Sequence, residues 1–110
     1  MSKSEKMMDA YKGMLKELKE IEATIEALPR GYISTKNISG HTYHYLQWRE
    51  GSRVLSTYVN DSLLAITQQK IVVRKANEEL LKIVKKDAAK LEKALLKMGV
   101  SEEELQNLKA

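Results

Sequence analysis

The 110-residue chain contains no cysteine and no phenylalanine, and it has a single proline. The absence of cysteine excludes a disulfide scaffold, a thiolate metal site and a cysteine nucleophile. No apolar run approaches the roughly 18 residues that a membrane-spanning helix needs, so we expect no membrane partner. The polar start, Met1–Lys6, lacks the apolar stretch of a signal peptide, and we therefore expect a cytoplasmic protein.

Hydrophobic residues make up 43% of the chain, which is enough for a core, and the length fits one domain over residues 1–110. Basic residues outnumber acidic ones by 19 to 15, for a net charge of +4. This excess is uneven, because residues 29–60 hold four basic residues against Glu50 alone. The same segment holds Trp48 and four of the five tyrosines. The middle of the chain therefore differs in charge and composition from its flanks.

Before the proline, apolar residues recur alternately four and three positions apart, which predicts a helix over residues 3–28 with a continuous heptad seam. The seam consists of Met7, Tyr11, Met14, Leu18, Ile21, Ile25 and Leu28. Pro29 ends the helix. Two interpretations follow: the seam packs inside the monomer, or it forms a coiled-coil homodimer.

The middle segment changes to an alternating pattern, with turn signals at Ser39-Gly40 and Gly51-Ser52. This predicts a sheet over residues 31–59, an antiparallel meander of strands 31–38, 41–50 and 53–59.

A second, longer helix is predicted over residues 61–98, starting among good cap residues at 60–62. Its expected seam is Leu80, Val84, Ala88, Leu91, Leu95 and Met98, with Ile66 and Val73 upstream. Gly99 is expected to end this helix in a left-handed conformation, and Ser101 to cap a short helix over 102–109. The second helix is expected to extend beyond the first. Either the short helix or a second chain would cover the apolar residues of the part that extends. The predicted fold class is α+β: helix, three-stranded meander, helix, short helix.

Two-residue turns would fix the register and give the sheet two unlike faces. The face expected to pack on the helices collects Ile33, Thr35, His44, Leu46, Trp48, Leu55, Thr57 and Val59. Its centre would be Trp48 opposite Leu55, with Leu46 opposite Ile33. We call this the apolar face.

The opposite face, here called the tyrosine face, collects Tyr32, Ser34, Lys36, Tyr43, Tyr45, Gln47, Arg49, Val54, Ser56 and Tyr58. It contains two cations and no carboxylate, and we expect it to face outward. Lys and Arg can hold phosphates, Gln can read a base edge, and Tyr can contact sugar or stack. Tyr is also common in protein interfaces. In addition, β-strands favour Tyr whether or not the residue has a binding role. The candidate binding residues are Tyr32, Lys36, Tyr43, Tyr45, Gln47, Arg49 and Tyr58.

A second candidate surface is a lysine stripe on one side of the second helix, interrupted by Glu79. It consists of Lys82, Lys86, Lys90, Lys93 and Lys97. Such a stripe is either a solvated helix face or a surface that binds the phosphate backbone of nucleic acid without recognising its base sequence.

Catalytic chemistry is not expected. His41 and His44 would lie on opposite faces of a strand and so could not share a metal easily. No carboxylate pairs with a histidine or serine in a pattern for acid–base or nucleophilic work. No glycine-rich phosphate loop is present. We therefore predict no catalytic residue, no metal and no cofactor.

The segments Gly31–Ile33, Tyr43–Gly51 and Thr57–Val59 resemble an uncharacterised family of small bacterial and mobile-element proteins. That family has a hairpin of the type GYI…YYYLQWREG…YI between two helices, and the resemblance spans about residues 15–85 of this chain. It implies a fold rather than an activity. Here His44 replaces a further Tyr, and Val54–Ser56 replaces a stretch that is often more basic.

The layout also resembles, more loosely, the three-stranded arm-binding domain of tyrosine recombinases, which lays its sheet face in DNA. That resemblance implies DNA binding through the tyrosine face. The sequence thus predicts a non-catalytic DNA-binding module. The alternative is a small protein-binding inhibitor or antitoxin-like protein of a phage, mobile-element or defence system, using the same face.

Overall fold

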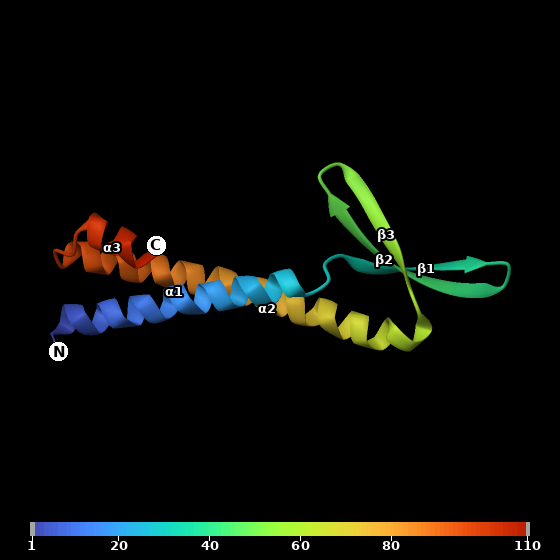
Figure 1. Cartoon of the computed structure of the whole chain (residues 1–110), viewed down its shortest axis with the longest axis horizontal. Coiled ribbons are helices and arrows are strands. Elements are labelled where there is room, and N and C mark those ends of the chain that lie inside the picture. The colour runs from blue at the N-terminus through green and yellow to red at the C-terminus, as the bar shows by residue number, and fades with distance from the viewer. Residues whose placement is uncertain (1, 110) are drawn as a thin grey trace. The chain divides into compact units, whose positions relative to one another are not determined.

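A computed structural model describes residues 2–109. Along the chain the elements are α1 (Lys3–Ala27), β1 (Tyr32–Ile38), β2 (His41–Glu50), β3 (Arg53–Val59), α2 (Asp61–Lys97) and α3 (Glu102–Lys109) (Figure 1). The fold class is α+β, as predicted, and each element begins and ends within one residue of its expected bounds. No described helix is both long enough and apolar enough to cross a membrane.

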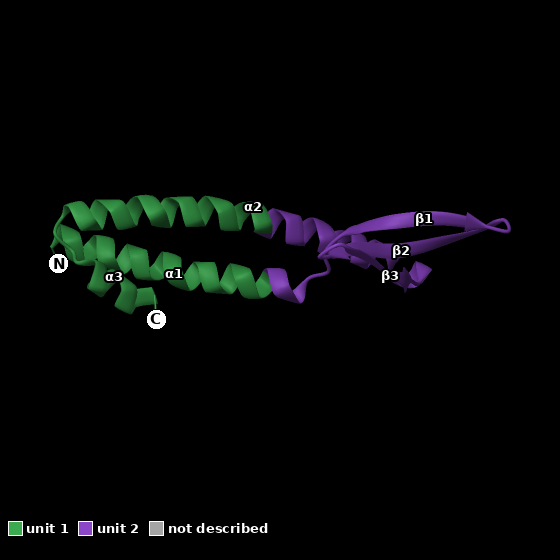
Figure 2. Cartoon of the chain, turned by 90° about the horizontal axis from the view of Figure 1, so that it is seen from above, with its two compact units in different colours: residues 1–24, 78–110 green, residues 25–77 purple. Residues whose placement is uncertain are grey.

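The chain divides into two compact units (Figure 2). Unit 1 comprises residues 1–24 and 78–110, and therefore most of α1, the second half of α2, and α3. Unit 2 comprises residues 25–77, which hold the end of α1, the whole sheet and the first half of α2.

Local capping explains where the helices begin and end. Ser2 Oγ accepts a hydrogen bond from the Glu5 N–H at 3.2 Å, which caps the start of α1. Gly99, with φ of +95°, ends α2, and the Val100 N–H bonds back to the Leu95 carbonyl at 3.1 Å. This is the glycine-centred helix ending that the sequence predicts.

The core of unit 1 forms where its three helices meet. Tyr11 of α1, Leu95 of α2 and Leu105 of α3 are each at most 1% exposed. The Tyr11 hydroxyl donates to Glu92 Oε2 at 3.1 Å, and Lys109 Nζ lies 3.3 Å from Glu92 Oε1. The short helix α3 therefore covers this part of α2. The predicted heptad seam of α1 packs within the monomer, with Tyr11 at its most buried position.

The predicted seam of α2 is correct in its middle and wrong at both ends. Val84, Ala88 and Leu95 are buried, but Leu80 and Met98 are each 41% exposed. Further upstream Ile66 and Val73 are also exposed, and Ile71 is buried in their place. Ile66 and Val73 belong to one apolar stripe of this helix, and Ile71 belongs to another. Tertiary packing buries the stripe that contains Ile71.

The sheet has the predicted strand order β1-β2-β3 and the predicted register. Ile38 pairs with His41, and Glu50 pairs with Arg53, each across a two-residue turn. Ser39 and Gly40 both have positive φ, as a type I′ turn requires. The two hairpins point in different directions because the sheet is strongly twisted (Figure 1).

The apolar face of the sheet is less covered than expected. Among the strand residues, all of which the structure describes, Val59 is the one that is buried. The expected central pairs, Trp48 with Leu55 and Leu46 with Ile33, form but are only partly buried. The prediction that this face packs on the helices therefore holds in part: Val59 is buried, and Leu46, Trp48 and Thr57 border a hollow with residues of α1 and α2.

Candidate functional site

Strand register brings all seven predicted binding residues onto one face of the sheet. Tyr32 lies opposite Gln47, and Lys36 lies opposite Tyr43. On the other side of β2, Tyr45 pairs with Tyr58 and Arg49 pairs with Val54. Because side chains alternate along a strand, these residues share the tyrosine face. The sequence predicted this arrangement from the two turns alone.

Three tyrosine rings form a connected cluster on this face. The Tyr58 ring meets the Tyr45 ring at a centroid distance of 6.0 Å and an interplanar angle of 68°. It also meets the Tyr43 ring at 6.4 Å and 60°. Lys36 Nζ lies 5.2 Å from the centroid of the Tyr45 ring, within cation–π range. Ring contacts therefore hold the tyrosines, and Lys36 is held against them.

The tyrosine face is exposed and carries positive charge only. Tyr32 is 56% exposed and Tyr58 is 53% exposed, while Tyr43 and Tyr45 are partly buried. Lys36 and Arg49 are exposed, and neither takes part in an ion pair among residues 2–109. The one acidic residue of the sheet, Glu50, points to the opposite face.

Sequence reasoning missed several residues that adjoin this face. The ring of His41, the first residue of β2, lies 6.4 Å from the Tyr43 ring between centroids. A hollow of about 260 Å³ is lined by Tyr32 of this face, by Ile33 of the apolar face, and by Ile71, Gln68, Val72 and Lys75 of α2. The helical spacing of 68, 72 and 75 could have shown that these three share a helix side. It could not have shown that this side meets β1.

The lysine stripe lies on unit 1 and is exposed at all five positions. Lys82 pairs with Glu79 at 3.1 Å, and both side chains are largely exposed. Such a pair contributes little to stability. The stripe is therefore a separate candidate surface on a different unit from the tyrosine face.

The histidines lie on opposite faces, as predicted. His44 Nδ1 is hydrogen-bonded to Thr35 Oγ1 at 3.0 Å on the apolar face, whereas His41 adjoins Tyr43 on the tyrosine face. Within residues 2–109, no three His, Asp or Glu residues gather in a group that could hold a metal ion.

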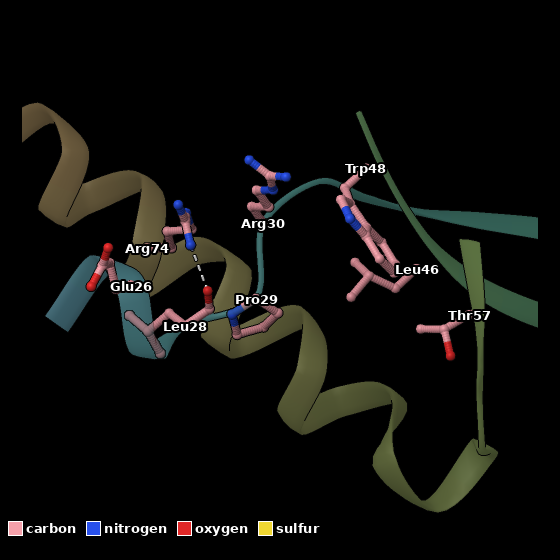
Figure 3. Close-up of a pocket in the computed structure, with 8 residues that line it drawn as sticks. All are labelled: Glu26, Leu28, Pro29, Arg30, Leu46, Trp48, Thr57 and Arg74. Atoms are coloured by element: carbon pink, nitrogen blue, oxygen red, sulfur yellow. Dashed lines mark hydrogen bonds between the residues drawn. The ribbon is translucent and has the colours of Figure 1, made fainter. Parts of the chain in front are cut away.

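The apolar face borders an open hollow of about 440 Å³ in unit 2 (Figure 3). Trp48 and Arg30 line it beside Arg74 of α2. Arg74 Nη1 donates to the Ile25 and Leu28 carbonyls at 2.7 and 2.6 Å, so this side chain caps the end of α1. Arg30 pairs with Glu50 at 3.3 Å. Both cations of the hollow are thus engaged within the protein.

Comparison with known proteins adds a family and no activity. Neither the curated proteins nor the solved structures contain a significant match to this chain. A family model described as a domain of unknown function, DUF6788, matches residues 11–69, which is more than half of the chain. The matched segment includes the complete tyrosine face, and the expectation of an uncharacterised family is confirmed. The chain belongs to the DUF6788 family.

Proposed function

We propose that this protein is a non-catalytic DNA-binding module and that its tyrosine face is the contact surface. One observation carries the proposal: an exposed sheet face combines four tyrosines with Lys36 and Arg49 and contains no carboxylate. Phosphate contacts supply most of the affinity of non-specific DNA binding, and a neighbouring carboxylate would oppose them.

Each candidate residue has a role that fits its position. Lys36 and Arg49 are free of carboxylate partners among residues 2–109 and would hold phosphates. Gln47, between them on the face, has an amide that can accept and donate at a base edge. The tyrosine hydroxyls can donate to phosphate or sugar oxygens.

The resemblances described above support the same proposal by analogy alone. The arm-binding domain of tyrosine recombinases presents a three-stranded sheet to DNA. An origin in a bacterium, phage or mobile element, and a cytoplasmic location, belong to the proposal as well. The lysine stripe would then add phosphate contacts that read no sequence.

The test is fluorescence anisotropy of labelled random-sequence DNA, titrated with the full chain at salt concentrations from about 50 to 200 mM. If Lys36 and Arg49 each hold one phosphate, affinity should fall about tenfold over this range. Arg49→Ala and Lys36→Ala should each weaken binding and lower the salt slope by about one. Unchanged affinity in both variants would exclude the proposed surface.

A matched control uses Arg53, which begins β3 on the opposite face of the sheet. Arg53→Ala removes the same charge as Arg49→Ala from the same sheet. If the tyrosine face is the contact, the Arg53 variant should keep nearly the wild-type affinity and slope. Equal losses in both variants would indicate attraction by net charge and no defined surface.

A second candidate function is supported by the exposed apolar groups of the same face. Val54 is 56% exposed beside Arg49, and Ile38 is 50% exposed near Lys36. Tyrosine, arginine and apolar groups together are typical of protein interfaces. The protein would then be a small inhibitor or antitoxin-like partner of a phage, mobile-element or defence protein.

Salt distinguishes the two functions. A tyrosine-centred protein contact should survive about 200 mM salt, whereas phosphate binding should weaken steeply. Tyr45→Ala should abolish such a protein complex while circular dichroism shows the fold intact. A homodimer through the helices remains a separate prediction, which the mass in solution over a range of concentrations tests.

A further inference from the structure

We infer that β3 is a docking edge for a second copy of this chain, and that two copies join through antiparallel β3 strands into one six-stranded sheet. The strand order β1-β2-β3 leaves β3 at one margin of the sheet (Figure 1). This inference does not depend on the proposed function, because it concerns the edge of the sheet and not the ligand of the tyrosine face. It also differs from a homodimer through the helices.

The register of the sheet determines which backbone groups of β3 point outward. Glu50 and Arg53 flank a two-residue turn, and residues in that position exchange backbone hydrogen bonds. Exchanging pairs alternate with non-exchanging pairs along an antiparallel ladder. The N–H and C=O groups of Val54, Ser56 and Tyr58 therefore point away from β2, toward the free edge. Within residues 2–109, no backbone group from outside the sheet bonds to them.

These outward groups are complementary to a second copy of themselves in one antiparallel register. If Ser56 lies opposite Ser56 of the second copy, Val54 of each copy lies opposite Tyr58 of the other. The outward N–H and C=O groups of all three residues then find partners across the two strands. A β-branched residue opposite an aromatic one is a favourable cross-strand pair. Arg53, the one charged residue of β3, lies opposite Val59, so that no like charges meet.

Composition and exposure favour pairing at β3 over pairing at β1. Strand β3 contains no proline or glycine, and residues 54–59 carry no charge. Exposed, uncharged edge strands of this kind are sites of association. Val54 is 56% exposed and Tyr58 is 53% exposed, and the pairing would cover part of both. The other edge strand, β1, carries Lys36, a residue that opposes edge pairing, and its start at Ile33 shares a hollow with α2.

The pairing would extend the tyrosine face across both copies. A two-fold axis perpendicular to the sheet keeps the same face of each copy on one side. Arg49 pairs with Val54, and Val54 would pair with Tyr58 of the second copy, which pairs with Tyr45 of that copy. The row that begins at Arg49 thus continues into two tyrosines. The second copy therefore contributes aromatic groups to the candidate site.

The association should be weak, because the interface is small. Each copy contributes the 7 residues of β3, whereas a standard stable interface uses about 20 to 30 residues a side. We therefore expect a dissociation constant of about 10 to 100 µM. Sedimentation of the full chain at concentrations up to about 1 mM measures it. A chain that stays monomeric throughout would overturn the inference and leave β3 to an extended segment of a different protein.

Charged substitutions at Ser56 test the register, because this residue alone lies opposite itself across the two-fold axis. Ser56→Lys brings two positive charges together and Ser56→Glu two negative charges. Each should weaken self-association about three- to tenfold. An equimolar mixture of the two variants should restore association to at least the wild-type level, since opposite charges then meet. Wild-type association of either variant alone, or a mixture that restores nothing, would overturn the inference.

Proline substitutions test the backbone contacts, with the other edge strand as the matched control. Ser56→Pro removes an outward N–H that the ladder with β2 does not use, and it should weaken association at least about tenfold. Asn37→Pro removes an outward N–H from β1, because Asn37 adjoins the exchanging pair of Ile38 and His41. It should leave association unchanged, and an equal or larger loss would overturn the inference.

A dimer through the helices would give a different pattern. Its association would be insensitive to all four substitutions, since none lies on a helix, and that result would also overturn the inference. Circular dichroism and Trp48 emission verify that each variant keeps its helices and its sheet.

Discussion

The two units bury their residues very differently. In unit 1, Tyr11, Leu95 and Leu105 are almost completely enclosed where three helices meet. In unit 2, the described residues classed as buried are Ile25, Val59 and Ile71, each 6–9% exposed. Both faces of the sheet keep accessible side chains. We infer that packing in unit 1 supplies most of the stability, whereas unit 2 depends on backbone hydrogen bonds and turn geometry to present a surface.

The largest effect should come from the core of unit 1. Leu95→Ala leaves a cavity at a fully buried position and should lower the free energy of unfolding by about 3 to 4 kcal/mol. Leu96→Ala is the matched control, because Leu96 is 37% exposed on the same helix turn, and it should cost about 0.5 kcal/mol. Chemical denaturation measures both. Equal losses would show that the enclosed position is no more important than its exposed neighbour.

The next effect tests the backbone geometry of unit 2. Gly31 has φ of +102°, and a Cβ at this position would clash with the Gln47 carbonyl oxygen. Gly31→Ala should therefore destabilise the protein by about 2 to 3 kcal/mol, since strain and a steric clash combine. Gly40 also has positive φ, but nothing lies within 4 Å of its Cβ position.

Gly40→Ala therefore carries the strain without the clash and should cost about 1 kcal/mol. Thermal unfolding of the two variants separates the two contributions. If Gly31→Ala destabilises the protein no more than Gly40→Ala does, β2 does not approach Gly31 as closely as the structure shows.

A smaller effect is expected at the junction of α1 and the sheet. Arg74→Met keeps a long apolar stem but removes the donors to the Ile25 and Leu28 carbonyls. It should cost about 1 to 2 kcal/mol. Arg74→Lys retains one charged donor and should recover part of the loss. Full stability of Arg74→Met in denaturant would contradict the capping role.

The smallest effect concerns the hydrogen bond from Tyr11 to Glu92. Tyr11→Phe should cost about 1 kcal/mol near neutral pH. Burial, followed by the contact with Glu92, raises the pKa of Tyr11 above its ordinary 10.0. The hydrogen bond to Glu92 likewise raises the pKa of Lys109 above 10.5. The folded protein then holds these protons more tightly than the unfolded chain does.

The contribution of these two groups to the free energy of unfolding should therefore be constant below about pH 10. It should fall as the pH rises through their pKa values in the folded protein. Urea unfolding between about pH 9 and 11 follows this loss. Tyr11→Phe should reduce the alkaline slope, since one of the two groups is gone. A slope equal to that of the wild type would show that Tyr11 does not titrate with unfolding.

The sheet could be predicted closely because its determinants are local. Ser39-Gly40 and Gly51-Ser52 specify two-residue turns, and these turns fix every cross-strand pair. The shared face of Tyr45, Tyr58 and Arg49 follows directly. The end of α2 at Gly99 is local in the same sense.

Tertiary features were harder to predict. The heptad spacing of Ile66, Val73 and Leu80 is as regular as that of a core seam, but these residues are exposed. Only the partner of α2 decides which apolar stripe is buried. The hollow between Tyr32 and Lys75 depends on the same packing. The position of Arg74 at the end of α1 joins residues 46 to 49 apart in sequence, and no local pattern indicates it.

Trp48 is the single tryptophan of the chain, and its indole N–H donates to Glu50 Oε1 at 3.3 Å on the apolar face. Its intrinsic emission therefore reports the environment of unit 2 selectively, with no second indole to mask it. The far-ultraviolet helix signal comes from all three helices, of which α1 and α2 extend through both units. Followed together in one denaturant titration, the two optical signals would coincide if the protein melts as one cooperative body. They would separate if the sheet loses its order first.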